Sequence, residues 1–177
     1  LGIRGSQSCQ IFLDEVRLSR EHLLGEVGQG FKVAMHTLDG GRIGIAAQAV
    51  GMARSALEVA IDYAKDRQSF GQAIIQHQAV GFRLADCATR LEAARQLIWH
   101  AASLRDAGRP CLKEAAMAKL FASEVAESIC SAAIQTLGGY GYVSDFPVER
   151  IYRDVRVCQI YEGTSDVQKI IIQRALA

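Results

Sequence analysis

From residue 31 onward, the apolar residues recur at helical spacing. Phe31, Ala34, Met35 and Leu38 occupy positions i, i+3, i+4 and i+7, which lie on one face of a helix. Gly40-Gly41 is expected to interrupt this first helix, because glycine is a poor helix former. The pattern predicts further helices over residues 43–66, 77–105 and 112–137, a short helix over 147–154, and a last helix from residue 165 to the end.

The predicted helices are long, rich in alanine and joined by short loops. Ser165 and Gln168 have the spacing of a capping box, which marks the start of the last helix. Long Ala-rich helices with short connections pack closely and antiparallel. The sequence therefore predicts an all-α protein built as an up-down four-helix bundle.

The first 18 residues follow a different pattern. Residues 3–18 partly alternate between apolar and polar side chains, which predicts a strand, or a strand with a turn. Gly25, Gly28 and Gly30 then break the chain before the helices begin. The sequence opens with Leu1 rather than Met, in the middle of a pattern, so we expect that part of the protein precedes it.

The composition narrows the classes of function. Twenty basic and 19 acidic residues give a formal charge of +1, and this lack of a basic surplus argues against a nucleic-acid partner. No apolar run approaches the roughly 18 residues that span a bilayer, so we expect no membrane span. Five scattered cysteines without a C-x-x-C pair indicate free thiols in a reducing compartment. Four histidines without an H-x-x-x-H pair predict no metal site.

Three loops hold candidate chemistry, and the first of them contains Glu162. Gly163 follows directly, and the last helix begins at Ser165. Glycine lets the backbone approach a ligand closely, and a helix N-terminus offers free N–H groups to an anion or an oxygen. A carboxylate held in such a turn is a candidate general base. The residues alone leave open the alternative of a solvated loop glutamate.

The other two loops are suited to phosphate or to a flat ring. In residues 135–141, three glycines within four positions follow a helix end and can cradle a pyrophosphate or a ring, or can simply stop the helix. In residues 66–71, Arg67 lies near Phe70, and an arginine beside an aromatic ring suits phosphate binding and stacking. A solvated helix end remains the alternative for this third loop.

At these loops the sequence resembles the acyl-CoA dehydrogenase family, especially its short-chain and short/branched-chain members. The matching segments, in chain order, are residues 1–6, 24–26, 30–32, 39–46, 67–71, 135–142, 147–150, 152–154 and 160–165. The likeness runs from end to end of the chain. Several motifs in the right order are far more specific than any one of them alone.

The resemblance implies a reaction and a set of site residues. The reaction is the FAD-dependent α,β-dehydrogenation of an acyl-CoA thioester, with Glu162 as the catalytic base and a hydride passing to flavin N5. The positions that match substrate contacts are Asp39, Gly40, Gly41, Arg42 and Gly163. The positions that match flavin contacts on the last helix are Thr164, Ser165 and Asp166. The positions that match contacts to the FAD of a neighbouring subunit are Arg67, Phe70, Gln78, Gln135, Thr136, Leu137, Gly138 and Gly139.

The resemblance also implies a domain organisation and partners. Residues 1–25 are expected to be a remnant of a middle β-domain, and residues 26–177 the C-terminal helical bundle. Much of the flavin and acyl-chain pocket then lies in parts that this chain lacks, so the chain alone is expected to be inactive. The implied partners are an acyl-CoA substrate, an electron-transfer flavoprotein and further copies of the protein in a homodimer or homotetramer. The implied compartment is the bacterial cytoplasm, or the mitochondrial matrix in a eukaryote.

One small departure and three alternatives accompany this interpretation. Asp166 stands where many relatives have glutamate, and the shorter acid keeps the charge. An acyl-CoA oxidase and a decarboxylating dehydrogenase are relatives with other chemistry, and oxygen consumption without an electron carrier would mark the oxidase. The third alternative is a non-catalytic helical fragment that dimerises, which absorbance by bound FAD would test.

Overall fold

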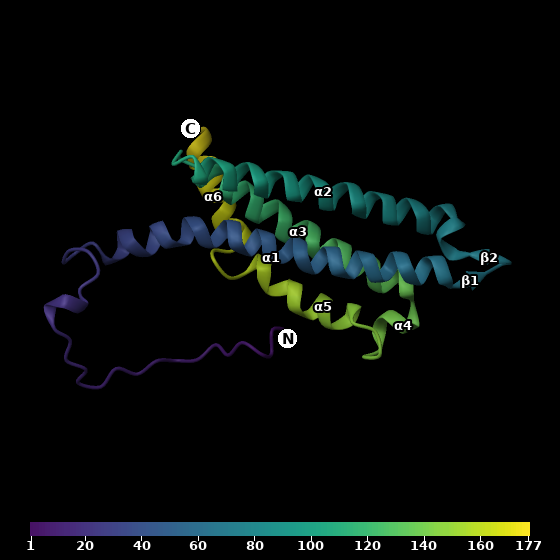
Figure 1. The fold of residues 1–177 in the computed structure, drawn as a ribbon, viewed down its shortest axis with the longest axis horizontal. Coiled ribbons are helices and arrows are strands. Elements are labelled where there is room, and N and C mark those ends of the chain that lie inside the picture. The colour runs from purple at the N-terminus through teal and green to yellow at the C-terminus, as the bar shows by residue number, and fades with distance from the viewer.

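Three long helices lie side by side, and each runs antiparallel to the next one along the chain (Figure 1). They are α1 (Gly30–Asp66), α2 (Gln78–Asp106) and α3 (Leu112–Leu137). This computed structural model describes the backbone of all 177 residues and every side chain except that of Asp39, so the prediction for the Asp39 side chain lies outside the described residues.

Shorter elements complete the fold. A small antiparallel hairpin joins α1 to α2, with β1 (Gln68–Ser69) paired to β2 (Gln72–Ala73). After α3 come α4 (Gly139–Tyr142), α5 (Val148–Val155) and α6 (Ser165–Leu176). Single 3-10 turns cover Arg20–His22, Ile74–Gln76 and Arg156–Gln159. The predicted all-α architecture is confirmed, and the described helices include none that is long and apolar enough to cross a membrane.

The core lies around α3, which packs against α1, α2, α5 and α6. Much of it is alanine: the fully buried positions include Ala46, Ala49, Ala53, Ala56, Ala60 and Ala64 of α1 and Ala115, Ala116, Ala118 and Ala122 of α3. Larger side chains such as Leu84, Leu91 and Ile129 are buried in the same core. Because a methyl group is the whole side chain at the closest approach, the helix backbones can lie near one another.

Gly40-Gly41 does not interrupt the first helix, and this corrects the prediction from sequence. Helix α1 runs without a break from residue 30 to residue 66. A Cβ atom at Gly40 would overlap the guanidinium group of Arg105, and one at Gly41 would overlap the carboxylate of Glu162. The two glycines therefore make room for side chains from other elements, at the ordinary cost in helix propensity of about 1 kcal/mol each.

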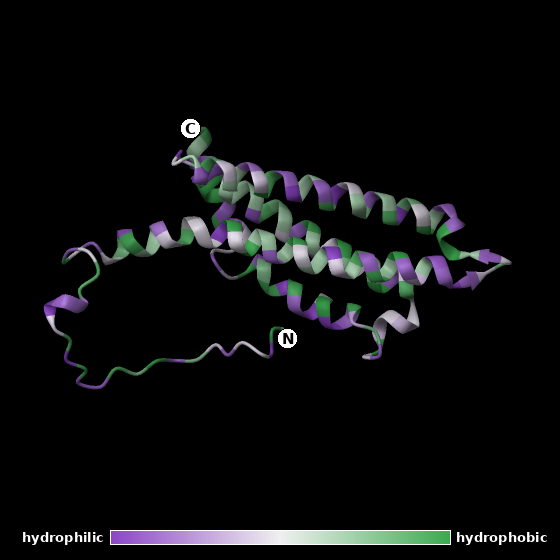
Figure 2. Cartoon of the chain, viewed as in Figure 1, coloured by the Kyte–Doolittle hydropathy of each residue, from purple (hydrophilic) through white to green (hydrophobic). Residues whose placement is uncertain are grey.

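Residues 3–18 form no strand in this chain, although the structure describes all of them, so the strand prediction is wrong here. They follow a long arc away from the helices, and alternating apolar stretches along it are exposed, with Phe12 84% accessible (Figures 1 and 2). Only the first residues return to the bundle, where the Ile3 N–H donates to Asp154 Oδ1 at 2.5 Å. A strand needs a partner for its backbone groups, and the described chain supplies none to this segment. The assignment of residues 1–25 to a preceding β-domain stays a prediction.

The last helix begins where it was expected, with a different cap. Thr164, not Ser165, is the N-cap residue, and its hydroxyl accepts a hydrogen bond from the Val167 N–H at 3.4 Å. Gln168 does not reach back to the cap as a capping box requires; its side chain turns towards the preceding loop instead. The short helix predicted over 147–154 is present as α5, one residue later.

Candidate functional site

The loop before α6 makes a tight turn through two residues with left-handed backbone. Glu162 has φ of 54° and Gly163 has φ of 89°. A positive φ is uncommon for a residue with a side chain and costs of order 1 kcal/mol or more, so the surroundings must hold it in place. Gly163 must be glycine for a second reason, because a Cβ atom there would lie 2.8 Å from Gln168 Nε2.

Two buried side chains hold this turn from opposite sides. Lys119 of α3 donates from Nζ to the carbonyl oxygen of Gly163 at 2.6 Å. Gln168 of α6 donates from Nε2 to the carbonyls of Gly163 at 2.9 Å and of Glu162 at 3.2 Å. Both side chains are completely buried. The backbone on either side of the Glu162–Gly163 bond is therefore tied to two different helices.

The turn directs the Glu162 carboxylate at the backbone of α1. A Cβ atom built on Gly41 would lie 3.0 Å from Glu162 Cδ, so the carboxylate occupies the space that this glycine leaves. Glu162 Oε2 is buried and has no hydrogen-bond partner among the described atoms, and the same holds for Ser165 Oγ and Gln168 Oε1 nearby in the chain. Buried polar atoms are normally paired. Three unpaired ones within seven residues indicate a place where a ligand supplies the partners.

Positive charge gathers beside this carboxylate. Arg42 of α1 is only 5% exposed, and Lys119 is fully buried. Burial lowers the pKa of Lys119 and the nearby Arg42 lowers it further, whereas Cys158 and Glu162 raise it.

Within the described residues, no group of three His, Cys, Asp or Glu side chains is arranged to bind a metal ion.

Tyr161, next to Glu162, is fixed by its own contacts. Its hydroxyl donates to Gln48 Oε1 of α1 at 2.7 Å and lies 3.8 Å from Cys158 Sγ. Burial raises the pKa of the Tyr161 hydroxyl, and burial also raises the pKa of the Cys158 thiol. Both groups therefore stay neutral. Their contacts fix the orientation of the Tyr161 side chain, directly before Glu162.

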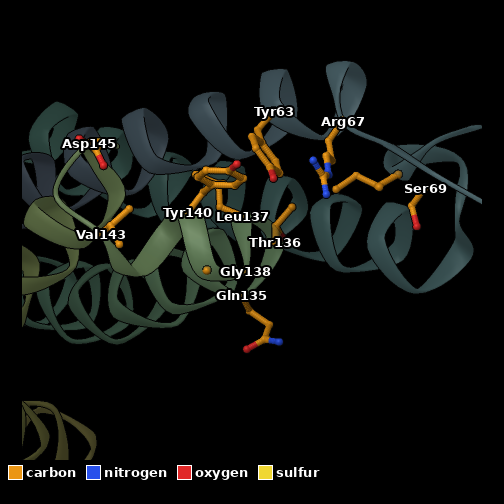
Figure 3. Close-up of a pocket in the computed structure, with 12 residues that line it drawn as sticks. Tyr63, Arg67, Ser69, Gln135, Thr136, Leu137, Gly138, Tyr140, Val143 and Asp145 are labelled. Carbon is orange, nitrogen blue, oxygen red and sulfur yellow. The ribbon is translucent and has the colours of Figure 1, made fainter.

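The predicted residues 135–139 line a cavity of about 710 Å³ at the far end of α1 (Figure 3). The walls come from the end of α1, the hairpin, the end of α3 and α4. The lining residues are Tyr63, Arg67, Ser69, Ile74, Gln135, Thr136, Leu137, Gly138, Gly139, Tyr140, Val143 and Asp145. Figure 3 shows Arg67 near Tyr63, whereas the Gln135 side chain points away from both. Gly138 has φ of 61°, so α3 ends there in a conformation that favours glycine.

Phe70 and Gln78 lie outside this cavity lining among the described side chains. Phe70 is at the tip of the hairpin, with φ of 51° and 97% of its surface exposed. Gln78 is the exposed first residue of α2. His77 connects the two regions: one ring nitrogen lies 3.1 Å from the Ser69 carbonyl oxygen and the other 3.1 Å from Gln72 Nε2. Phe70 therefore lies on the hairpin that projects from the bundle, and Gln78 begins the helix that follows it.

The Glu162 turn and the cavity are far apart. The turn contacts α1 at Gly41, and the cavity is lined by Tyr63 of the same helix. At about 1.5 Å per residue, these positions are about 33 Å apart along α1. The structure therefore separates the expected flavin contacts into two groups, Thr164 to Asp166 beside the turn, and Arg67 with residues 135–139 at the other end.

The family description "Acyl-CoA dehydrogenase, C-terminal domain" matches residues 28–177. This chain belongs to the acyl-CoA dehydrogenase family. The human mitochondrial short-chain specific acyl-CoA dehydrogenase is 53% identical over 97% of this chain and 42% of that protein. The caffeyl-CoA reductase-Etf complex subunit CarC of Acetobacterium woodii is 49% identical over 99% of this chain and 46% of that protein.

Solved structures agree with this membership. Butyryl-CoA dehydrogenase from Megasphaera elsdenii has a TM-score of 0.89 and 48% identity, over 90% of this chain and 42% of that one. PigA, in a structure with FAD and proline, has a TM-score of 0.84 and 35% identity, over 86% of this chain and 40% of that one. The chain spans less than half the length of the curated relatives it matches. Residues 28–177 correspond to the C-terminal domain of an acyl-CoA dehydrogenase.

Several residues that hold the candidate site were missed by the sequence reasoning. Lys119 and Gln168 hold the turn, and His77 holds the hairpin. A signal for Lys119 was present: it lies four positions after Ala115 and three before Ala122, on a face of α3 whose other residues are small. A lone lysine on an apolar helix face calls for a buried partner. His77 gave no comparable signal.

Proposed function

We propose that this chain carries the catalytic base and parts of two flavin-contacting surfaces of a FAD-dependent acyl-CoA dehydrogenase for short acyl-CoA thioesters. The observation that carries the proposal is the setting of Glu162. Its carboxylate projects from a turn with two left-handed residues, faces the side-chain-free position Gly41, and has a buried oxygen without a partner among the described atoms. The names of the short-chain and butyryl-CoA relatives support the substrate class.

In the proposed reaction the thioester loses its α-hydrogen as a proton and its β-hydrogen as a hydride. Glu162 takes the proton on its carboxylate. An α-C–H is a weak acid, so its removal needs donors that stabilise the negative charge growing on the thioester oxygen. The free N–H groups at the turn and at the start of α6 are the donors that this chain offers. When bound, FAD accepts the hydride.

The two groups of flavin-contacting residues fit FAD in different ways. Beside Glu162, the unpaired Ser165 Oγ and the N-terminus of α6 suit the polar atoms of a flavin. At the other end, the backbone of residues 135–139 and the Arg67 guanidinium suit a phosphate or a ring. A separation of about 33 Å exceeds a flavin ring system, so the two groups cannot both contact one ring, and we assign each group to a different FAD molecule. The cavity therefore contributes to the FAD site of a second copy, in a homodimer or homotetramer.

The remaining partner is an electron-transfer flavoprotein, which would receive the electrons. The name of the CarC relative, a subunit of a complex with Etf, supports this partner. The named relatives include mitochondrial and bacterial proteins, so the mitochondrial matrix and the bacterial cytoplasm are the two compartments proposed.

The test replaces Glu162 by glutamine in the full-length enzyme that contains this chain. Glu162→Gln keeps the shape of the side chain and removes the base. We expect the rate of flavin bleaching by butyryl-CoA in stopped flow to fall by about 10²–10⁴-fold, with FAD content and acyl-CoA binding kept. Glu124→Gln, at an exposed position of α3, is the matched control and should bleach at the wild-type rate. A Glu162→Gln enzyme that bleaches flavin at the wild-type rate would show that Glu162 is not the base.

The same preparation distinguishes the oxidase alternative. The wild-type enzyme with acyl-CoA is expected to reduce an added electron-carrier dye and to consume little oxygen without one. Rapid oxygen uptake in the absence of any carrier would show that the enzyme is an acyl-CoA oxidase. Glu162 would keep its proposed role as the base.

A further inference from the structure

Lys119 is a buried cation on a helix face whose other residues are small. None of its surface is exposed, and its neighbours one turn away on α3 include Ala115 and Ala122. Removing an ammonium group from water costs several kcal/mol unless hydrogen bonds and opposite charge compensate. Lysine is almost never fully buried without a partner. Its place in the middle of α3 therefore calls for a reason beyond packing.

The partner of Lys119 is the backbone of the turn that carries Glu162. Its Nζ donates to the Gly163 carbonyl at 2.6 Å, a short bond from a charged donor. That carbonyl oxygen belongs to the residue directly after Glu162, and it also accepts from Gln168 Nε2 at 2.9 Å. Each carbonyl oxygen can accept two hydrogen bonds, so Lys119 and Gln168 together saturate it.

The turn is the part of the chain that most needs such support. Glu162 and Gly163 both have positive φ, and without compensation a loop with a strained glutamate would relax towards ordinary backbone angles. A relaxation of that kind would rotate the Glu162 side chain away from Gly41. Lys119 belongs to α3, which packs against α1, α2, α4, α5 and α6, so it ties the turn to the central helix of the fold.

We propose that Lys119 is a positioning residue for the catalytic step. It fixes the Gly163 carbonyl and so keeps the Glu162 carboxylate pointed at the place where the acyl-CoA α-carbon is bound. This inference rests on the proposed function, because it assigns Lys119 a role through Glu162. The contact that carries this role is the hydrogen bond of Lys119 to the Gly163 carbonyl.

The charge of Lys119 has a second consequence at the same place. The groups around it are Glu162, Cys158 and Arg42, of which Glu162 carries the opposite charge. The ammonium therefore attracts the carboxylate from behind while it holds the backbone of the turn. Removal of the ammonium takes away both the donor and this attraction.

The test is Lys119→Met in the full-length holoenzyme. Methionine has nearly the length of lysine and suits an apolar surrounding, but it cannot donate to the Gly163 carbonyl. We expect the limiting rate of flavin bleaching by butyryl-CoA, per bound flavin, to fall about 10–100-fold, since a misplacement of about 1 Å can cost as much as 100-fold. The dissociation constant for butyryl-CoA should stay within about threefold, because substrate contacts are unchanged.

The matched control is Lys113→Met, the same exchange on the same helix. Lys113 is partly exposed and pairs with Glu114 at 3.3 Å, away from the turn. It should bleach at the wild-type rate. Normalising the rate to bound flavin separates a catalytic defect from a loss of folded protein. Where Lys119→Met does not accumulate as a folded flavoprotein, Gln168→Met removes the other donor to the same carbonyl and is expected to give the same slow bleaching.

Deuterium at the substrate α-carbon provides a second readout. If the Lys119→Met enzyme is slow because its base is misplaced, the α-deuterium isotope effect on bleaching should be at least as large as in the wild type. A purely structural lysine would change the yield or the melting temperature and leave the rate per flavin within twofold, and that outcome would overturn the inference.

Measuring Glu162→Gln beside Lys119→Met distinguishes the proposed base from the proposed positioning residue. A slow Glu162→Gln enzyme with a fast Lys119→Met enzyme overturns the positioning role alone. A fast Glu162→Gln enzyme overturns the proposed base, and with it the reason for a positioning residue.

Discussion

Gly41 and Glu162 constrain each other although they lie in different elements. The glutamate side chain fills the space above α1 that a missing side chain leaves. The resemblance to the family assigned Gly41 to the substrate, but the geometry gives it a more direct role, because any larger residue would displace the carboxylate. A glycine inside a long helix is normally a weakness. Here it is the condition for the carboxylate to reach its place.

The contact between Gly41 and Glu162 predicts different effects on the reaction rate for two glycine substitutions in α1. In the full-length enzyme, Gly41→Ala should raise helix propensity and yet slow flavin bleaching by at least about tenfold, because the new Cβ atom pushes the base aside. Gly44→Ala lies one turn further on, where a Cβ atom would meet nothing within 4 Å. It should keep the wild-type rate and raise the unfolding free energy by about 0.5–1 kcal/mol. Equal bleaching rates in the two variants would contradict this account of Gly41.

The sequence supplied the acid of the site more readily than its supports. Glu162 and Gly163 could be predicted because they form a recognisable local motif. The place of Lys119 in the sequence indicated that it needs a buried partner, but which partner depends on how α3 meets the turn. The sequence did not indicate the hydrogen bonds of Gln168 to the carbonyls of the turn. Gln168 was given a role as the end of a capping box, and local spacing does favour that role. In the structure its amide donates instead to the carbonyls of Glu162 and Gly163, six and five residues earlier in the chain.

At the scale of the element, the hairpin between α1 and α2 is held by one histidine. His77 precedes α2, and its ring contacts the Ser69 carbonyl and the Gln72 amide while Phe70 packs edge-on against it at 6.1 Å. The hairpin has only two residues in each strand, too few for independent stability. Its shape, and with it the wall of the cavity beside Arg67, depends on these contacts.

His77→Ala is therefore expected to loosen the hairpin and to weaken FAD binding without impairing the chemical step. The loss of two hydrogen bonds of about 1 kcal/mol each sets an upper limit on the loss of binding free energy. We therefore expect the dissociation constant for FAD to rise about three- to tenfold. Fluorescence titration of the apoenzyme with FAD measures it. His100→Ala, at an exposed position of α2, should bind FAD as the wild type does. A His77→Ala enzyme with unchanged FAD affinity but slow bleaching would mean that the hairpin serves catalysis instead.

The hydrophobic periodicity located every helix longer than one turn. It failed where contacts with other parts of the chain determine the local structure. Gly40-Gly41 was expected to end a helix, but the need for room beside Arg105 and Glu162 explains the two glycines instead. Residues 3–18 have a pattern that suits a strand, yet a strand exists only with a partner, and the described chain offers none. The hairpin was expected as a loop, since its strands are too short to show a period of two.

At the scale of the whole molecule, the two groups of expected flavin contacts cannot serve one flavin ring. One group lies at the turn beside Gly41, and the other surrounds the cavity near Tyr63, about 33 Å along α1. In an assembly with two-fold symmetry, each copy gives its own turn to one active site and its cavity to the other. The catalytic unit would then be no smaller than a dimer.

Complementation between two inactive variants tests this sharing of sites. Glu162→Gln removes the base and leaves the cavity intact, whereas Arg67→Glu spoils the cavity and leaves the base intact. Each variant alone should be nearly inactive. Co-expressed, half of the dimers formed at random are mixed, and each mixed dimer has one intact site of two, so about a quarter of the wild-type activity should return. The measurement is dye reduction with butyryl-CoA, normalised to flavin.

The control for complementation is a mixture of the two separately purified variants under conditions in which subunits do not exchange. It should stay inactive. If the co-expressed enzyme also stays inactive while it contains mixed dimers, the base and the cavity act within the same copy. The proposed role of Arg67 and residues 135–139 would then be lost.

The alanine core changes how inherited variation in this region should be interpreted. In a core built from leucine, the harmful exchanges remove volume and leave a cavity. Many fully buried positions of α1 and α3, Ala53 and Ala118 among them, are already small, so the harmful exchanges at these positions are those that add volume. An alanine-to-valine change there would rank as conservative on any scale of hydrophobicity. Because it pushes the helices apart, we expect it to destabilise the fold more than most charge changes on the outer surface of α2.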